Sequence, residues 1–361
     1  MKRRGIGFAL VIGAGLLAAA GGLLWWRAET DPSRIPASDW SRFRNRFVSA
    51  DGRVVDTGNG GVSHSEGQGY GMLLAEACGD RRSFDRIWNW TRTNLQTRPD
   101  DKLLSWQWKP SSDGNGGSVT DPNNASDGDL LVAWALVRAS KRWGIYAYQQ
   151  AAAEILLDLH RLAVRQTPAG PILLPGVHGF VKDSGTTLNG SYYVFPAFRE
   201  IVAAFPGTGW DRVAAFGHQL LRQTLFGDAR LNPDWFLDAN GFYSLETQFP
   251  PDFGYNAIRI PLHLAWENPR SELLGTYVNF WRGFPDLSKM PATVNLETNT
   301  FGPDPALPGM ESIARFTLAA GAGQQLAIRD IPPVSSEEPY YSASLKLLTK
   351  LAIRDTIGGR R

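Results

Sequence analysis

Cysteine is nearly absent from this sequence. Cys78 is the single cysteine in 361 residues, so the chain cannot build an internal disulfide framework. The five histidines form neither an HExxH pair nor a cluster with cysteine, which argues against a metal site. The glycine-rich residues 58–61 lack the lysine of a phosphate-binding loop. We therefore expect no metal, no nucleotide and no other cofactor.

Long blocks of like charge are also missing. The chain has 37 Lys and Arg against 35 Asp and Glu, a net charge of +2. Residues 2–4 and 360–361 are short basic groups at the chain ends, and no longer basic block occurs. A nucleic-acid partner is therefore not expected.

Large aromatic residues, in contrast, are plentiful. Thirteen Trp and ten Tyr are more than a core of this size needs, although most of them are expected to be core residues. Flat amphipathic rings of this kind suit flat partners such as the faces of sugars.

The N-terminus has the pattern of an export segment. The positive residues 2–4 precede an uncharged apolar run, residues 5–26, which contains three consecutive alanines at 18–20 as a candidate cleavage site. The run is also long enough to cross a bilayer as an uncleaved anchor. We expect residues 1–30 to be a signal peptide or membrane anchor, and the protein to be secreted or periplasmic, with a membrane tether as the alternative.

The rest of the chain is predicted to be largely helical, as one domain over residues 37–357. Apolar spacing predicts helices at residues 82–95, 127–143, 146–164, 193–205, 210–226, 253–266, 271–284, 310–320 and 340–353. Short ribbons are expected at residues 53–55, 172–175 and 177–180. Residues 130–137 are apolar on all sides, whereas residues 146–164 mix polar and apolar positions. An alternation of buried and solvent-facing helices favours an α/α barrel of two concentric layers.

The stretch SHSEGQGYGM, residues 63–72, places three glycines in the first turns of a helix. Each should cost about 1 kcal/mol relative to alanine, so we expect the missing side chains to leave room for another backbone or a ligand beside Glu66. Ser65 and Gln68 stand at the spacing of a helix capping box. Asp127 lies at a second helix start, in the polar stretch NNASDGD. Both acids are open to a simpler interpretation, in which they only cap helix N-termini.

Two opposed carboxylates together with aromatic platforms are what glycoside hydrolysis requires. HSEGQGYGM (64–72) and ASDGDLL (125–131) resemble the two signature segments of glycoside hydrolase family 8, and DTGNGG (56–61), SWQW (105–108) and YNAIRIP (255–261) fall in the matching order along the chain. The likeness is greatest to bacterial endo-β-1,4-glucanases associated with cellulose synthesis. It implies an (α/α)6 barrel and inversion of configuration.

The resemblance also implies roles for individual residues. Glu66 matches the general acid, whose pKa we expect to be raised so that it keeps its proton. Asp127 matches the acid that binds and distorts the sugar at the bond being cut. The expected substrate-binding residues are Trp106, Asn124, Tyr192, Tyr255, Asn256 and Arg259.

Asn256 is where the sequence departs from the family. Many members have Asp at this position as the general base, and an amide cannot accept the proton. Asp252 and Glu246 are the nearest acids in sequence and the expected replacements, with Asp252 favoured because it directly precedes the helix predicted to carry Asn256.

Two functions remain open at this point. The first is an endo-acting, inverting hydrolase of β-1,4-glucan such as cellulose, with xylan, mixed-linkage glucan and chitosan as other substrates that share the β-1,4 bond. The second, motivated by Asn256, is a weakly active or non-catalytic glucan-binding component of a cellulose export complex. A cellulose synthase complex is the expected partner in either case.

Overall fold

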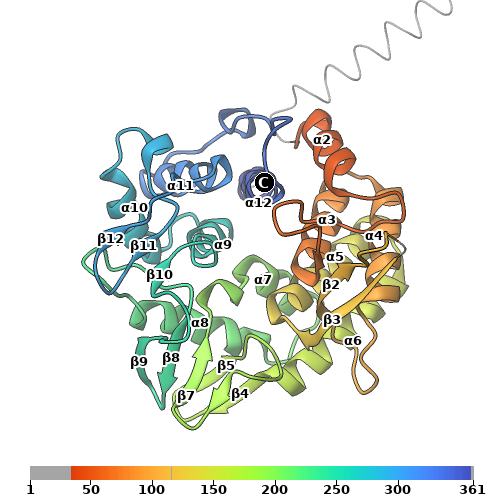
Figure 1. Ribbon diagram of the computed structural model, residues 1–361, viewed down its shortest axis with the longest axis horizontal. Helices are drawn as coiled ribbons and strands as arrows, with labels where there is room; N and C mark the ends of the chain where they lie inside the picture. Colours follow the sequence, from red (N-terminus) through yellow and green to blue (C-terminus); the bar gives the residue numbers. More distant parts are fainter. Residues whose placement is uncertain (1–33, 115, 359–361) are drawn as a thin grey trace, which may run out of the picture.

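The computed structural model describes residues 34–114 and 116–358, and its main feature is a ring of helices (Figure 1). Six mostly buried helices pack against one another around this ring. They are α3 (Ser65–Ala77), α5 (Ser126–Trp143), α7 (Phe195–Ala204), α9 (Arg259–Glu267), α11 (Pro308–Gly321) and α12 (Tyr340–Gly358). The ring closes where α12 packs against both α11 and α3.

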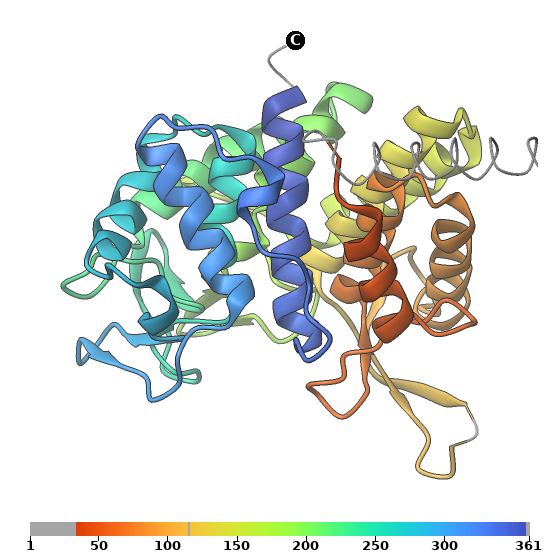
Figure 2. The same ribbon diagram turned by 90° about the horizontal axis from the view of Figure 1, so that it is seen from above.

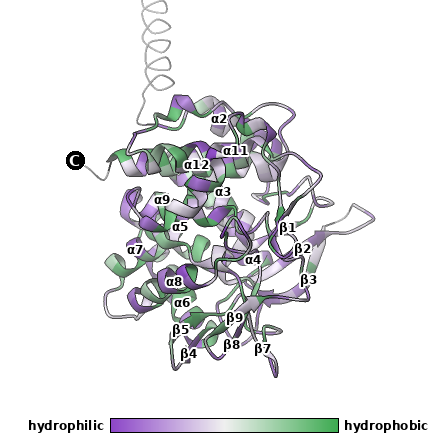
Figure 3. Ribbon diagram, turned by 90° about the vertical axis from the view of Figure 1, so that its left-hand side faces the viewer, coloured by the Kyte–Doolittle hydropathy of each residue, from purple (hydrophilic) through white to green (hydrophobic). Residues whose placement is uncertain are grey.

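A second set of helices covers this ring from outside. Each has one buried and one exposed face, as expected of helices between a core and solvent. They are α2 (Ala37–Phe47), α4 (Arg81–Asn94), α6 (Tyr146–Ala163), α8 (Trp210–Gln223) and α10 (Gly275–Arg282). Figure 3 shows many hydrophilic residues on outer helices such as α8. The prediction of two concentric helical layers is confirmed.

Short antiparallel strands lie in the connections, mostly at one end of the ring (Figure 2). One sheet has the order β1 (Ser63–His64), β2 (Ser105–Pro110), β3 (Gly117–Asn124), and another the order β6 (Val181–Lys182), β7 (Gly185–Leu188), β8 (Phe236–Ala239), β9 (Phe242–Leu245). The smaller sheets are β4 (Val164–Thr167) with β5 (Gly170–Leu173), and β10 (Asp252–Phe253), β11 (Val294–Asn295), β12 (Thr300–Phe301). Short 3-10 turns are η1 (Gly190–Tyr192), η2 (Glu272–Leu274), η3 (Leu287–Lys289) and η4 (Ile328–Asp330).

Several sequence-based boundaries were wrong. The helix predicted from residue 253 begins at Arg259, because residues 252–253 pair with β11 and residues 254–257 form a turn bonded to Asp234. Of the three predicted ribbons, residues 172–173 belong to β5, residues 53–55 contribute only an isolated bridge between Val54 and Val48, and residues 177–180 form no strand. The predicted export segment, residues 1–30, lies outside the described residues. Within 34–114 and 116–358, no helix combines the length and apolarity needed to cross a membrane.

Candidate active site

Three helices of the inner ring begin at one point. Glu66 is the second residue of α3, Asp127 the second residue of α5, and Arg259 the first residue of α9. Carboxylates are favoured at helix N-termini by the helix dipole, whereas an arginine there is not. The two acids therefore provide the negative charge that Arg259 needs.

Arg259 joins the two acids through a single nitrogen. Its Nη1 donates to Glu66 Oε2 at 2.5 Å, to Asp127 Oδ2 at 2.9 Å and to the Tyr70 hydroxyl at 3.2 Å. We call Glu66, Asp127 and Arg259 the Arg259 cluster. The side chains of Arg259 and Asp127 are 3% and 2% exposed, but that of Glu66 is 20% exposed. Glu66 is therefore the acid of the cluster that solvent or a ligand can reach.

The second terminal nitrogen of Arg259, Nη2, holds the side chain of Asn256 in place. Arg259 Nη2 donates to Asn256 Oδ1 and to Ser191 Oγ, both at 3.0 Å. The Tyr192 ring lies 5.9 Å from the guanidinium carbon, within the range of a cation–π interaction. The structure thus gathers four predicted site residues, including both carboxylates, around the buried Arg259, itself a predicted site residue.

The interpretation of Glu66 as a mere helix cap is wrong. The cap of α3 is His64, whose Nδ1 accepts from the Gly67 N–H at 3.0 Å. Gln68 does not cap either, because its side chain accepts from the Val54 N–H at 2.6 Å and donates to Thr91 Oγ1 at 2.7 Å. The Glu66 carboxylate is left for Arg259.

The proton of the cluster is not where the sequence predicted it. Burial raises the pKa of Glu66, but the positive charges of Arg259 and His64 together with hydrogen bonds from Asp127 and Tyr70 outweigh burial, and the pKa falls below its usual value. Burial and the Glu66 charge raise the pKa of Asp127 to about 7. The two carboxyl groups are in hydrogen-bonding contact, so near neutral pH the pair shares one proton, held mainly by Asp127.

The three glycines of α3 make room for protein, not for a ligand. A Cβ at Gly69 would lie 2.6 Å from Leu131 Cβ on α5, and one at Gly71 would lie 2.7 Å from Val54 Cγ2. On the facing helix, a Cβ at Gly128 would lie 2.1 Å from Ser65 Oγ. These contacts let α3 and α5 approach closely, which brings Glu66 and Asp127 together. Of the two expected occupants, another backbone or a ligand, the first is confirmed at Gly69, where the α5 backbone lies 3.2 Å from the position of a Cβ. The expectation of a ligand beside these glycines was wrong.

The aromatic residues predicted for binding lie in different surroundings. Trp106 on β2 is partly exposed, whereas its neighbour Trp108 is buried edge-on against Trp90 with ring centroids 5.5 Å apart. Tyr255 is 44% exposed and packs against Tyr341, with centroids 6.0 Å apart. Trp106 and Tyr255 therefore remain available to a ligand.

Asn124 is not placed for substrate. It is 3% exposed, its Nδ2 donates to Asp129 Oδ2 at 2.8 Å, and its Oδ1 accepts from the Val177 N–H at 2.7 Å. Both ends of the amide are used inside the protein, so Asn124 connects the start of α5 to the following loop. Its predicted binding role is corrected to a structural one.

The two predicted replacements for the base lie outside the cluster. Glu246 is buried, and its carboxylate accepts from the Thr187 hydroxyl at 2.5 Å and from the N–H groups of Thr247 and Gln248 at 2.9 and 3.2 Å. Asp252 is partly exposed at the start of β10, and burial alone raises its pKa.

Asp234 is a carboxylate that the sequence did not single out. Its Oδ1 accepts from the N–H groups of Gly254, Asn256 and Ala257 at 3.1, 2.9 and 2.6 Å. Burial raises its pKa to about 6, although these bonds and Arg259 act in the opposite direction. Asp234 thus holds the turn before α9 in place. The only sequence signal was its position in the Asn-Pro-Asp-Trp segment, residues 232–235.

No group of three His, Cys, Asp or Glu side chains among the described residues is arranged to hold a metal ion.

Comparison with known proteins agrees with this geometry. The chain matches the model of glycosyl hydrolases family 8 over residues 20–355. It is 39% identical to a probable endoglucanase of Novacetimonas hansenii over 343 residues, covering 94% of this chain and 96% of the relative. It is 37% identical to an endoglucanase of Cellulomonas uda, covering 82% of each chain.

Solved structures show the same similarity. The endoglucanase Cel10 from Klebsiella pneumoniae superposes with a TM-score of 0.82 at 38% identity, covering 88% of this chain and 99% of that one. The endo-β-1,4-glucanase CMCax from Acetobacter xylinum gives a TM-score of 0.78 at 40% identity, covering 89% and 98%.

Proposed function

The chain belongs to glycosyl hydrolase family 8, and from that premise we propose that it cuts internal β-1,4 bonds of a glucan by acid/base inversion in an (α/α)6 barrel. One observation carries the proposal: Glu66 and Asp127 both accept a hydrogen bond from one nitrogen of the buried Arg259, and of the two acids only Glu66 is open to a ligand. Similarity to endoglucanases over nearly the whole chain supports glucan as the substrate.

Glu66 acts as the general acid. A glucan laid over Glu66 displaces water from its carboxylate, and this desolvation favours transfer of the shared proton from Asp127 to Glu66. Glu66 then protonates the leaving oxygen, while water attacks the anomeric carbon from the opposite face. Asp127, left ionised beside Arg259, stabilises the positive charge that develops on the sugar.

The base must be a carboxylate, since Asn256 cannot accept the proton. Asp234, Asp252 and Glu246 are the three candidates. Glu246 is 4% exposed and both of its carboxylate oxygens accept hydrogen bonds, which makes it a poor base. The three hydrogen bonds to Asp234 all go to Oδ1. Asp234 has the strongest geometric support, because it is partly exposed and bonds directly to the turn that carries Asn256.

The test is release of reducing ends from carboxymethylcellulose. The wild-type protein should release them, and Glu66→Gln, which keeps the shape but cannot donate the proton, should lose activity by a factor of about 100 or more. A wild-type protein that binds cellulose without cutting it would instead support a glucan-binding component of an export complex, the function that the neutral Asn256 favours. The same assay on xylan, mixed-linkage glucan and chitosan identifies the preferred substrate.

The proposed location is outside the cytoplasm, with residues 5–26 as an export signal or tether and a cellulose synthase complex as the partner. Phe47 at the end of α2 packs on Tyr340 at the start of α12, while Asp39 at the start of α2 pairs with Lys350. The two helices are therefore antiparallel. The chain enters α2 at the end away from the start of α12, where Tyr340 packs on His64, two residues before Glu66. A tether there would leave the active site facing away from the membrane. Fractionation of cells expressing the full chain tests this location.

A further inference from the structure

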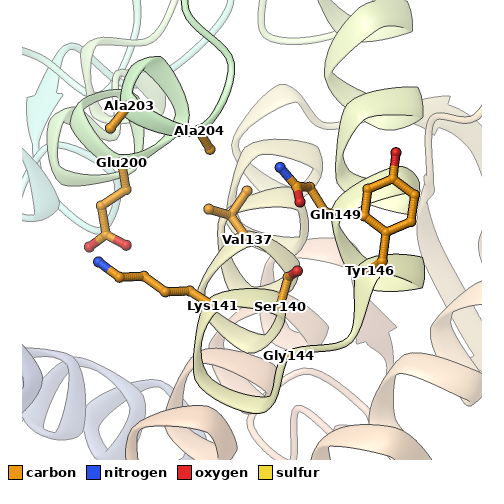
Figure 4. A pocket seen from close by; sticks show the side chains of 9 residues that line it. All are labelled: Val137, Ser140, Lys141, Gly144, Tyr146, Gln149, Glu200, Ala203 and Ala204. Atoms are coloured by element: carbon orange, nitrogen blue, oxygen red, sulfur yellow. The ribbon is translucent and has the colours of Figure 1, made fainter.

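A hollow of 540 Å³ lies at the opposite end of α5 from the Arg259 cluster (Figure 4). It is enclosed by the end of α5, the beginning of α6 and the end of α7. Its lining includes the side chains of Val137, Ser140, Lys141, Tyr146, Gln149 and Glu200. We call it the Tyr146 hollow.

The Tyr146 hollow is separate from the active site. Asp127 stands in the first turn of α5, and Gly144 directly follows the last residue of that helix. Gly144 follows Asp127 by 17 residues, which is about 25 Å at a rise of about 1.5 Å per residue, and Val137, the lining residue nearest to Asp127 along α5, follows it by ten residues, about 15 Å. A ligand in the hollow therefore does not touch the Arg259 cluster.

A flat ring stands at the edge of the hollow. Tyr146 is the first residue of α6 and is 67% exposed, and Figure 4 shows the Gln149 amide beside it. Val137, Ala203 and Ala204 supply apolar surface. An aromatic face next to amide and hydroxyl groups is the combination that binds a pyranose, since the ring stacks on C–H groups and the polar groups bond the hydroxyls.

The hollow is bordered by charged side chains of both signs. In Figure 4 Lys141 and Glu200 extend towards one another from α5 and α7, and Glu200 also lies 3.5 Å from Arg138. Charges of both signs favour neither an anion nor a cation, and this many polar groups disfavour a lipid. A neutral polyhydroxyl ligand fits best.

We propose that the Tyr146 hollow is a second, non-catalytic binding site for a β-glucan chain. The choice of glucan rests on the proposed function, because that polymer is what an endoglucanase meets. Holding one part of an insoluble polymer raises the effective concentration of neighbouring bonds at the active site. The site should therefore matter for polymer and not for short soluble substrates.

The experiment measures binding of the full chain to phosphoric-acid-swollen cellulose, in a Glu66→Gln background that cannot cut it. Adding Tyr146→Ala should weaken binding about 3- to 10-fold, the scale of one lost aromatic contact. Leu157→Ala is the matched control, because Leu157 is 70% exposed on the same helix, and it should bind as the parent does. With Glu66 intact, Tyr146→Ala should keep the wild-type kcat/KM on cellopentaose.

Three results would overturn the proposal: unchanged cellulose binding by Tyr146→Ala, an equal loss in Leu157→Ala, or a parallel loss of kcat/KM on cellopentaose. The proposed function is tested by a separate measurement. It fails if the wild-type protein releases no reducing ends from carboxymethylcellulose.

Discussion

Arg259 is the residue on which the active site depends. Its side chain is 3% exposed, so its charge must be balanced by nearby anions. Glu66 and Asp127 supply this balance, and Arg259 in return lowers the pKa of the exposed acid. The same guanidinium orients Asn256. One buried cation therefore explains both the position of the acids and the location of their shared proton.

The base can be identified by comparing three substitutions. If Asp234 is the base, Asp234→Asn should lower kcat on carboxymethylcellulose by a factor of about 100 or more, because a neutral amide cannot accept the proton from water. Asp252→Asn and Glu246→Gln should each lower it less than about tenfold. Adding Asn256→Asp to Asp234→Asn should restore part of kcat, since it places a carboxylate at the position where many family members have one.

The double variant separates a base from a residue that only holds the turn. If Asp234 only fixes the backbone before α9, a new carboxylate at 256 will not restore activity, and the assignment fails. A larger loss of kcat in Asp252→Asn than in Asp234→Asn would identify Asp252 as the base instead.

Asp127 should make the folded protein less stable as the pH rises. Burial and the charge of Glu66 raise its pKa from 3.8 to about 7, so the folded chain holds this proton more tightly than the unfolded chain. The resulting stability is fully present below about pH 4 and is lost as the pH passes about 7. The shift of roughly 3 units corresponds to at most about 4 kcal/mol. By calorimetry, Tm should fall less between about pH 5 and pH 8 in Asp127→Asn than in the wild type, and equal falls would contradict this assignment.

At the scale of elements, the contact between α3 and α5 sets the distance between the two acids. The glycines cost helix propensity in α3, but they allow a closer approach than any side chain would. Gly69 faces Leu131 on α5, and Gly128 on α5 faces Ser65 on α3. Both helices therefore have a glycine, without a side chain, at this contact, close to Glu66 and Asp127 in sequence.

Gly69→Ala tests this contact. The new Cβ would lie 2.6 Å from Leu131 Cβ and 3.2 Å from the α5 backbone, so α3 must move. We expect a loss of about 1–3 kcal/mol in the free energy of unfolding, measured by urea denaturation, together with a lower kcat as Glu66 shifts. Gly275→Ala is the control, since a Cβ at the start of α10 meets nothing within 4 Å. Equal stability of the two variants would show that the α3–α5 contact tolerates a methyl group.

At the scale of the whole molecule, the first and last described helices are joined by a buried ion pair. Lys350 Nζ on α12 lies 2.5 Å from Asp39 Oδ2 on α2, with side chains 2% and 0% exposed. Asp39 Oδ1 also accepts from the Val334 N–H at 2.9 Å. This pair attaches the outer helix α2 to the inner ring and so joins the first and last helices of the described part of the chain.

Breaking this pair should therefore destabilise the entire fold. Lys350→Met removes the close partner of the buried Asp39 and leaves only Arg42 at 4.0 Å and the Val334 N–H. Breaking a buried pair in this way costs about 3–5 kcal/mol, visible as a lower Tm. The double variant Lys350→Met/Asp39→Asn should recover much of the loss, because no charge remains buried. Lys289→Met, which removes an 82% exposed lysine, should leave Tm unchanged. A Tm loss as large in the double variant as in Lys350→Met would assign the effect to packing and not to charge.

The sequence predicted the helices more reliably than it predicted the site. The α6 helix was placed to within a residue, because its apolar positions recur at helical spacing over five turns. The α9 helix was placed six residues too early, because the preceding turn has no periodicity and is held by Asp234, 22 residues before Asn256 in sequence. Asn124 was misassigned for a similar reason, since its partner Val177 lies 53 residues away.

The sequence by itself determined the ring of helices and the two acids at helix starts, because hydrophobic periodicity and local motifs are written in neighbouring residues. Only the tertiary structure decided what those acids do. The pKa values of Glu66 and Asp127, the role of the glycines and the place of Asp234 all depend on groups far apart in sequence, and burial and charge act through space.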